Sequence, residues 1–383
     1  MINEQNIDVK LPDTSKLIIS SSPHLHDGSS VRKIMYLVVL ALLPSCIMGV
    51  YYFGFAAVKV LLVCVVSSLF FEFILCKLLG RKNDWKDGSA IITGLLMGML
   101  LSAGMPWWVC IIGTFIAIVF GKQVYGGIGY NPFNPACVGR IALIIGFPKL
   151  MTSWVPTRFM DKSQFIFDKA VLSDAQIESI KSLPSLPFLN SVIDGVSSAT
   201  PLNMVKMSKS LGTATEQFMG TMSDWNSLWN YAIGNLGGCI GETSAIALII
   251  GGLFLIYLKL IKWQVPVAYL GTVAIFSTIV HYTQSSPALP GAMYQMLTGG
   301  LLIGALFMAT DMVTTPMTWK GGVIFGVGCG VITSVIRDWG GYPEGVMFAI
   351  VLMNAFTPLI DRWTANKPFG TKITKIAGDA KLS

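Results

Sequence analysis

The sequence predicts an all-α polytopic membrane protein with about ten transmembrane helices arranged as two five-helix inverted repeats. Three observations support this fold class. Of the 383 residues, 53% are hydrophobic and only 12% are charged, and the mean hydropathy is +0.64, whereas a soluble globular protein has about 25% charged residues. Apolar runs of the ~17–25 residues that a spanning helix requires recur along the chain. The two halves are also similar to each other.

The apolar runs form two groups of five, separated by one long polar segment. The first group lies at about 33–53, 56–79, 88–104, 106–121 and up to 147, and the second at about 228–260, 265–282, 292–308, 321–336 and 345–360. The sixth run is long and is interrupted at 237–242, so we interpret it as an approach segment followed by one span. Each half therefore contributes five spans.

The basic residues predict how the chain is oriented in the membrane. With the N-terminus inside, the cytoplasmic loops contain fourteen Lys and Arg side chains, whereas the opposite short loops contain Arg337 and, at a border, Lys59. This asymmetry follows the positive-inside rule, and it accounts for the net charge of +7 without nucleic acid as a partner. The expected regions are a cytoplasmic N-terminal segment (1–32), a first membrane repeat (33–147), an outer-face loop (148–227), a second membrane repeat (228–361) and a cytoplasmic tail (362–383).

Similar sequences occur in the same order in both halves. Ile92-Thr-Gly-Leu-Leu-Met-Gly-Met-Leu matches Leu297-Thr-Gly-Gly-Leu-Leu-Ile-Gly-Ala-Leu, and Tyr125-Gly-Gly-Ile-Gly-Tyr-Asn-Pro matches Trp339-Gly-Gly-Tyr-Pro. Because five is an odd number of spans, the second copy enters the membrane from the opposite side, as in inverted-repeat transporters with broken helices. Chance similarity between Gly-rich stretches is the alternative.

The cysteines and histidines do not suggest a metal centre. The seven cysteines lie in or beside apolar runs and form no Cys-x-x-Cys pair, which argues against an iron–sulfur cluster or a disulfide framework within this chain. The histidines at 24, 26 and 281 are too scattered for a metal site. The first thirty residues are polar, so we expect no cleavable signal peptide there.

A stretch of small residues around one hydroxyl, Asp194-Gly-Val-Ser-Ser-Ala-Thr-Pro-Leu202, lies in the central polar segment. Pro201 restricts its own φ and favours an extended conformation at Thr200. We therefore expect Thr200 on an open turn that another molecule can reach. An ordinary surface turn is the alternative, since Gly, Ser, Asp and Pro are common turn residues.

Several polar residues lie at membrane depth. Asn131 and Asn134 flank the break before the fifth span, close to Arg140. An amide at this depth needs a partner, and its paired donor and acceptor suit a flat heterocycle. Helix punctuation by Asn-Pro turns is the alternative.

Three carboxylates also fall within or beside the spans. Glu72 lies close enough to Lys77 to pair with it, and it is a candidate ion-path carboxylate, with a packing role as the alternative. Glu242 begins the sixth span, where the helix dipole favours an acid. Asp311 follows the eighth span, on the loop side.

Four stretches give the chain a resemblance to a known family. They are Ser22-Pro-His-Leu-His, Gly129-Tyr-Asn-Pro-Phe-Asn-Pro-Ala136, Ser197-Ser-Ala-Thr-Pro-Leu202 and Gly234-Asn-Leu-Gly-Gly-Cys-Ile-Gly-Glu-Thr-Ser244. Over almost its whole length the chain resembles the D subunits of Rnf complexes, the membrane-bound electron-transfer complexes that link ferredoxin and NAD. The B subunit of the sodium-pumping NADH:quinone oxidoreductase is the related alternative.

The resemblance implies a covalent cofactor. In this family a flavin transferase attaches FMN, through a phosphoester, to the threonine of an Asp-x-x-Ser-x-Ala-Thr pattern. Asp194, Ser197, Ala199 and Thr200 match that pattern position by position. A second, non-covalent flavin (riboflavin) is implied near Asn131 and Asn134.

The resemblance further implies a bacterial inner-membrane subunit that passes electrons through FMN, coupled to transport of Na⁺ or H⁺. Its partners would be the A, B, C, E and G subunits of the Rnf complex, the flavin transferase and membrane lipid, with ferredoxin and NAD bound by other subunits. The expected fold is similar to that of urea and ammonium transporters. A solute transporter or channel is therefore the alternative from another functional class.

Overall fold

The structure is a computed structural model that describes residues 30–80, 86–155, 157, 200, 202–203, 205–206, 224–235, 237–283, 291–342 and 344–365. Within these residues the chain is helical and forms no continuous strand, and an isolated bridge joins Ser102 and Cys239. Five of the described helices are long and apolar enough to cross a membrane. The protein is thus an all-α membrane protein.

In the first half, the helices begin and end close to the ends of the apolar runs. They are α1 (Val31–Phe53), α2 (Phe55–Leu78), α3 (Ser89–Met99), α4 (Trp107–Val119), the short 3₁₀ turn η3 (Gln123–Tyr125), α5 (Pro135–Gly146) and α6 (Pro148–Met151). Ser30 caps α1 by accepting a hydrogen bond from the Lys33 N–H, and Pro106 stands immediately before α4. Cap and proline signals therefore set these helix starts.

The second half contains more interruptions. Its elements are α10 (Trp225–Ile233), η6 (Ile240–Glu242), α11 (Ala245–Tyr257), α12 (Gln264–Thr283), α13 (Ala292–Leu297), α14 (Leu301–Ile303), the π-helical turn η7 (Gly304–Met308), α15 (Trp319–Trp339) and α16 (Val346–Thr364). The sixth apolar run is interrupted at 237–242, as predicted, and η6 lies in this interruption between α10 and α11. The eighth run is broken between α13 and α14, where Gly299 (φ +74°) and Gly300 (φ +62°) adopt the left-handed conformation that favours glycine.

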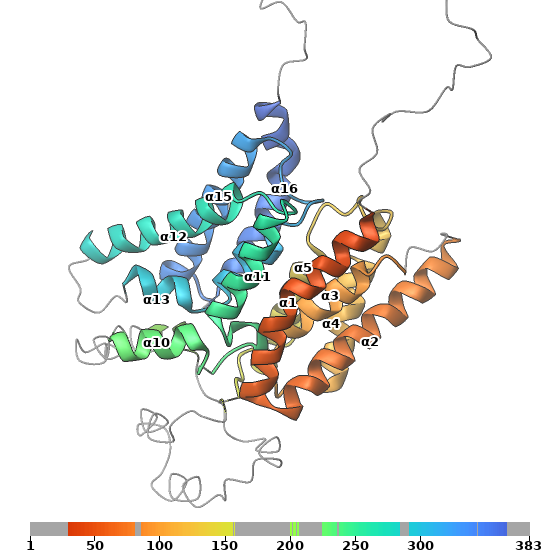
Figure 1. Cartoon of the computed structure of the whole chain (residues 1–383), viewed down its shortest axis with the longest axis horizontal. Coiled ribbons are helices and arrows are strands. Elements are labelled where there is room, and N and C mark those ends of the chain that lie inside the picture. The colour runs from red at the N-terminus through yellow and green to blue at the C-terminus, as the bar shows by residue number, and fades with distance from the viewer. Residues whose placement is uncertain are drawn as a thin grey trace, which may run out of the picture.

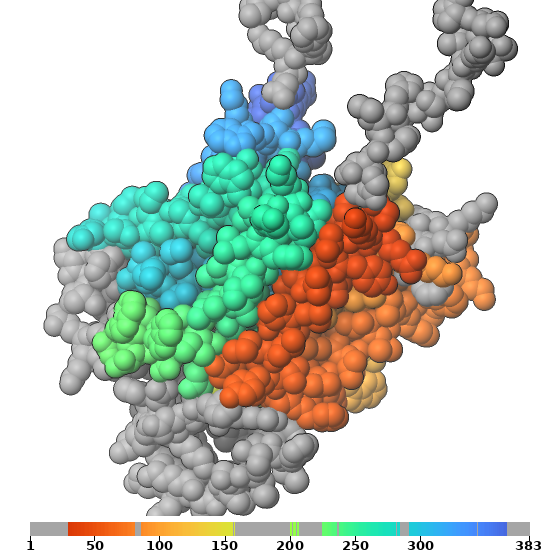
Figure 2. Space-filling view, in the orientation of Figure 1, coloured from red at the N-terminus to blue at the C-terminus, as the bar shows by residue number. Residues whose placement is uncertain are grey.

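The two halves use the same packing order. In the first half α2 packs against α3 and α4, and α4 packs against α5; in the second half α12 packs against α13 and α15, and α15 packs against α16. The halves meet where α1 contacts α11 and where α5 contacts α16. Figure 2 shows this seam on one face, with the red helix α1 beside the green helix α11.

In Figure 1 the start of α1 and the end of α16 lie in the upper part of the molecule, and α10 lies in the lower part.

The interrupted segments contact one another in the centre of the bundle. The Ile240 N–H donates to the Leu101 carbonyl at 3.0 Å, beside the Ser102–Cys239 bridge. The segment after α3 is thereby paired with the segment before α11. Backbone groups that leave a helix inside an apolar core need such partners, so each break depends on the other.

The α1–α11 contact generates a stability prediction. A Cβ on Gly251 of α11 would overlap the Ala41 carbonyl of α1. Gly251→Ala is therefore expected to destabilise the protein by about 1–3 kcal/mol, the usual cost of overpacking. Gly271→Ala in α12 is the matched control, because nothing lies within 4 Å of a Cβ there, and alanine favours a helix over glycine by roughly 0.5–1 kcal/mol. Thermal unfolding of the two purified variants should shift in opposite directions, and equal shifts would contradict the packing.

Candidate functional site

Thr200 is buried in the structure. Its side chain is 2% exposed, and its hydroxyl accepts a hydrogen bond from the backbone N–H of Asn203 at 3.2 Å, the pattern of a helix N-cap. The expectation of an open, reachable turn is therefore wrong with respect to exposure. The local sequence predicted a turn, but it could not reveal that the following residues pack onto the membrane helices.

Apolar packing holds the segment that follows Thr200. Leu202 and Val205 are buried in a cluster with Tyr294 of α13, and Leu228 and Tyr231 of α10 pack against this cluster. The Tyr231 and Tyr294 rings meet edge to face with centroids 5.7 Å apart. Burial raises the pKa of the Tyr231 phenol to about 12. The segment that follows Thr200 is thus held against an aromatic surface formed by α10 and α13.

A lysine attaches the same segment to the end of α15. The Lys206 Nζ donates to the carbonyls of Ile336 at 3.4 Å, Gly340 at 2.6 Å and Tyr342. A cation is favoured at this position because helix carbonyls there lack partners and carry partial negative charge.

The opposite end of α15 lies beside the end of α16. The hydroxyls of Thr318 and Thr364, which flank the start of α15 and end α16, are 2.5 Å apart. The 21 residues of α15 span roughly 30 Å at 1.5 Å per residue. The Thr200 segment and the C-terminal end of α16 therefore lie on opposite sides of the helical bundle.

The other three residues of the Thr200 motif, Asp194, Ser197 and Ala199, lie outside the described residues. The assignment of these residues to a flavin attachment motif stays a prediction.

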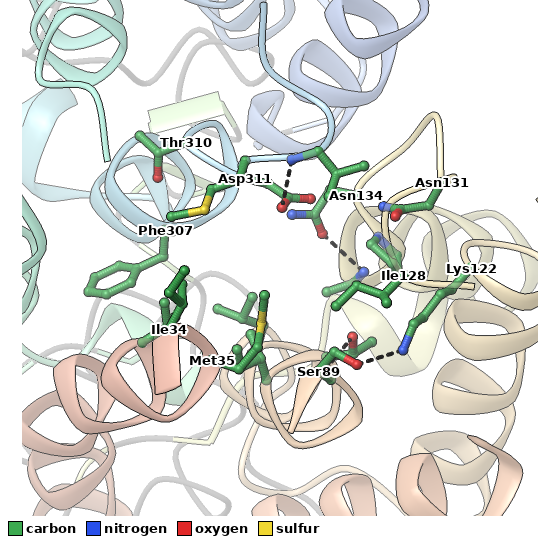
Figure 3. A pocket seen from close by; sticks show the side chains of 18 of the residues that line it. Ile34, Met35, Ser89, Lys122, Ile128, Asn131, Asn134, Phe307, Thr310 and Asp311 are labelled. Carbon is green, nitrogen blue, oxygen red and sulfur yellow. Dashed lines mark hydrogen bonds between the residues drawn. The ribbon is translucent and has the colours of Figure 1, made fainter. Parts of the chain in front are cut away.

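The second predicted site lies in a cavity of about 110 Å³ between the two halves. Figure 3 shows side chains from both halves around it, with Ile34 and Met35 of α1 facing Phe307 of η7. Asn131, Asn134, Ser89, Lys122 and Asp311 supply polar groups to its wall. The structure thus brings the predicted asparagine pair together at a mostly apolar cavity.

Each asparagine also has a structural role. Asn134 caps α5, since its Oδ1 accepts from the N–H groups of Ala136 and Cys137 at 3.1 and 3.4 Å, and its Nδ2 donates to the Met308 carbonyl. Asn131 donates from its Nδ2 to the Phe133 carbonyl at 3.1 Å. Helix punctuation is confirmed for Asn134, and the interaction with Met308 also joins the two halves.

Glu72 has a different partner from the one expected. Its carboxylate lies 2.5 Å from the Lys122 Nζ, which also donates to the Ser89 hydroxyl at 2.7 Å. Lys77 is exposed at the end of α2, so the predicted Glu72–Lys77 pair is wrong. Glu72 is fully buried beside Lys122, which follows the end of α4, whereas Lys77 is exposed. Closeness in the sequence does not reveal which of the two lysines pairs with Glu72.

Asp311 lies in the connection between η7 and α15, on the loop side as expected. Its carboxylate accepts from the Val313 N–H and the Thr314 hydroxyl, both at 3.4 Å. Burial raises the pKa of the Asp311 carboxyl, and these two hydrogen bonds act in the opposite direction.

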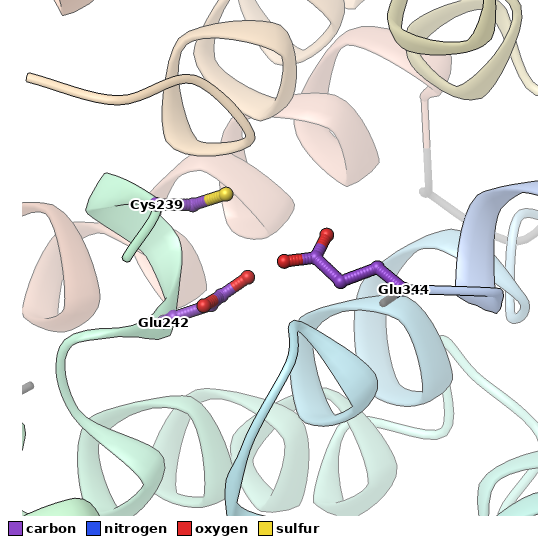
Figure 4. A group of neighbouring side chains, drawn as sticks. All are labelled: Cys239, Glu242 and Glu344. Carbon is purple, nitrogen blue, oxygen red and sulfur yellow. The ribbon is translucent and has the colours of Figure 1, made fainter. Parts of the chain in front are cut away.

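A buried charged cluster was not found by sequence reasoning. Arg140 of α5 donates to the Glu344 carboxylate at 2.7 Å and to the Cys239 Sγ at 3.1 Å. Glu242 lies beside Glu344 and Cys239, as Figure 4 shows. Glu242 is therefore part of this cluster rather than only a helix-start acid. Glu344 is 204 residues from Arg140. Two features of the sequence could have indicated this pair. A buried arginine requires an acid, and Glu344 directly follows Trp339-Gly-Gly-Tyr-Pro, the stretch that matches the break before α5.

Comparisons with known proteins show the family to which the chain belongs. The model of the NQR2, RnfD, RnfE family matches residues 18–370. The chain belongs to this family. Within the NQR2, RnfD, RnfE family it is 41% identical, over 92% of this chain and 96% of the relative, to the D subunit of the proton-translocating ferredoxin:NAD(+) oxidoreductase complex of Clostridium ljungdahlii.

Two further relatives have similar coverage. Identity is 37% to the D subunit of the Na(+)-translocating ferredoxin:NAD(+) oxidoreductase complex of Acetobacterium woodii, over 95% of this chain and 98% of the relative. The identity is also 37% to the D subunit of the ion-translocating oxidoreductase complex of Shigella boydii, over 92% of this chain and 98% of the relative. The likeness to these family members therefore extends over both membrane halves and the segment between them.

The Lys206 contacts generate a prediction about access to position 200. All seven native cysteines are buried, so a Thr200→Cys probe can be followed by maleimide labelling. Labelling should be slow with Lys206 present and about tenfold or more faster with Lys206→Ala, because a charge-assisted hydrogen bond contributes about 1.5–3 kcal/mol.

The matched control is Lys262→Ala. The Lys262 Nζ donates in the same way to the carbonyls of Pro316 and Met317, at the opposite end of α15. This substitution should leave labelling at position 200 unchanged. The attachment would be contradicted if both lysine variants accelerated labelling equally, or if neither did.

Proposed function

We propose that this chain is the D subunit of an ion-translocating ferredoxin:NAD⁺ oxidoreductase complex and carries FMN on Thr200. The observation that supports the first part most strongly is its similarity, over more than nine-tenths of its length, to subunits with that name. The second part rests on the Asp194-x-x-Ser-x-Ala-Thr200 pattern and on the location of Thr200. The activity belongs to the assembled complex, in which this chain is the flavin-bearing membrane subunit.

The proposed topology has ten spans in two inverted repeats of five. The repeated packing order of α2–α5 and α12–α16 supports it, as does the position of the Thr200 segment at the opposite end of α15 from the C-terminal end of α16. The positive-inside count assigns that end of α16 and both termini to the cytoplasm. Thr200 then belongs to the outer face of a bacterial inner membrane, and the proposed fold resembles that of the urea and ammonium transporters.

The surroundings of Thr200 fit a phosphoester. The hydroxyl is the phosphate acceptor, and the Asn203 N–H that points at it lies at the start of a helical turn, where an anion is favoured. Because Thr200 is 2% exposed, the transferase needs the segment in an undocked state. Attachment of the flavin therefore precedes docking of Leu202 and Lys206 onto the membrane helices.

When bound, FMN would supply the one- and two-electron chemistry that amino-acid side chains lack. The residues of this chain fix its position. Lys206 holds the segment on the carbonyls at the end of α15, and Leu202 packs against α13. A short attachment to rigid helices limits the distance over which an electron must pass to a neighbouring subunit.

The cavity beside Asn131 and Asn134 is the proposed riboflavin site. Its apolar walls from α1, α3 and η7 suit an isoalloxazine ring, and the two amides supply donors and acceptors at its edge.

The proposed partners are the A, B, C, E and G subunits of the Rnf complex, with ferredoxin and NAD bound elsewhere in the complex and Na⁺ or H⁺ as the transported ion.

The covalent flavin is tested at Thr200. Protein coexpressed with a flavin transferase should give a fluorescent band after denaturing electrophoresis, and Thr200→Val should abolish it, because valine has the shape of threonine without the hydroxyl. The exposed Thr152 provides the control, and Thr152→Val should keep the band. Fluorescence that persists in Thr200→Val would remove the assignment.

The non-covalent flavin is tested separately. Asn131→Leu and Asn134→Ser should each lower extractable riboflavin several-fold, while the covalent band stays intact. Serine is chosen at position 134 because it keeps an oxygen that can cap α5, whereas losing the cap costs about 1 kcal/mol. Riboflavin content equal to that of the unsubstituted protein would rule out a role for the pair.

A further inference from the structure

The carboxyl groups of Glu242 and Glu344 lie close together inside the bundle. Single ligand atoms of Glu242, Glu344 and Cys239 are all within 4.8 Å of one another, and Figure 4 shows the three side chains pointing towards a common point. Glu242 is 7% exposed. Two carboxylates at this distance in an apolar interior do not both stay ionised, because each disfavours the charge of the other.

The surrounding charges compensate only one of the two. Arg140 forms an ion pair with Glu344 at 2.7 Å. In the described part of the chain, no lysine or arginine nitrogen lies within 4.0 Å of the Glu242 carboxylate. Arg337 of α15 interacts with both acids at longer range, but it donates its hydrogen bonds to the carbonyls of Gln295, Thr298 and Gly299 and to the Gln295 side chain.

The helices that pack against η6 add no further charge near Glu242. α3 and α14 contain no ionisable side chain, and the charged residues of α1, Arg32 and Lys33, lie at its far end from the η6 contact at Gly49. The groups that face Glu242 are therefore Glu344, Cys239 and Arg140, with Arg337 beyond them.

A hydrogen-bond donor is missing at the same point. The Glu344 Oε1 is completely buried and has no hydrogen-bond partner. A buried acceptor without a donor is costly. A proton on Glu242 would supply that donor and would also neutralise the uncompensated carboxylate.

The packing disfavours a hydrated metal ion as the alternative cation. A Cβ added at Gly238 would lie 2.6 Å from the Glu242 Oε2, and one added at Gly300 would lie 3.2 Å from the Oε1, so both oxygens rest against backbone. The third group, Cys239, offers sulfur, which is a poor ligand for a hard cation such as Na⁺. The positive charge of the Arg140 guanidinium, which is paired with Glu344, also repels a metal ion bound at these three groups.

We propose that Glu242 holds one exchangeable proton, shared with Glu344, in the interior of the membrane domain. The proton is bound between the segment that precedes α11 and the segment that precedes α16. The latter segment also receives the Lys206 hydrogen bonds, at Gly340 and Tyr342, so the proton site and the Thr200 segment share one loop. The proposal is independent of the flavin, since it rests on the carboxyl pair and its charges.

Infrared difference spectroscopy of the full-length flavinylated protein in lipid nanodiscs tests the proposal. At neutral pH the unsubstituted protein should show the C=O stretch of a protonated carboxyl that shifts on exchange from H₂O to D₂O. Glu242→Gln should remove this band, and Glu344→Gln should shift its frequency. Glu72→Gln is the matched control, because Glu72 is also buried but is paired with Lys122 at 2.5 Å. This substitution should leave the band unchanged.

Three results would overturn the proposal. The first is no exchangeable band in the unsubstituted protein, and the second is a band that stays unchanged in both Glu242→Gln and Glu344→Gln. The third is a band that disappears when NaCl replaces choline chloride, because that result would assign the site to sodium. The first and third results need no variant, so a misfolded variant does not prevent the decision. Fluorescence of the Thr200 flavin, recorded on the same samples, separates failure of this proposal from failure of the flavin assignment.

Discussion

The structure depends on one constraint: every polar backbone group that leaves a helix inside the apolar bundle must find a partner within the protein. Arg337 meets this demand at the break between α13 and α14, where its guanidinium donates to the carbonyls of Gln295, Thr298 and Gly299 at 2.6, 2.9 and 3.0 Å. At the break before α11, the backbone hydrogen bond from the Ile240 N–H to the Leu101 carbonyl satisfies this demand. The breaks are therefore fixed structural features, each satisfied by a distant part of the chain.

These fixed breaks form the base for both functional regions. Leu202 packs directly against Gly299, next to the Arg337 guanidinium, so the Thr200 segment docks on the same break that Arg337 supports. Glu242 lies against Gly300, one residue further along. One short glycine pair thus contacts both the Thr200 segment, which is the proposed flavin carrier, and the buried carboxyl pair. These two glycines are the contact through which the proposed flavin and the proposed proton site would be connected.

Much of the fold could be predicted from the sequence, because a bilayer imposes length and hydrophobicity on each span. The limits of α1, α2, α15 and α16 lie within a few residues of the predicted runs, and the break in the sixth run was visible from its glycines. Asn134 as a helix cap could also be predicted, since Asn followed by Pro is a local signal.

The site could be predicted only in part, because its partners come from distant segments. Glu72 pairs with Lys122, 50 residues away, instead of Lys77, and Glu242 of η6 faces Glu344, which follows α15 later in the same half. Local sequence specifies a turn or a cap, but it does not specify which helix end a segment packs against. The same reason explains Thr200: the turn was predictable, but the burial of Thr200 and the packing of Leu202 and Val205 on distant helices were not.

The most direct test of the central claim is mass spectrometry of the proteolytic peptide that contains Thr200, from protein matured with its flavin transferase. The account predicts a peptide heavier by the mass of FMN less one water, with fragment ions that place the addition on Thr200. An unmodified peptide, or an addition located on another residue, would contradict it.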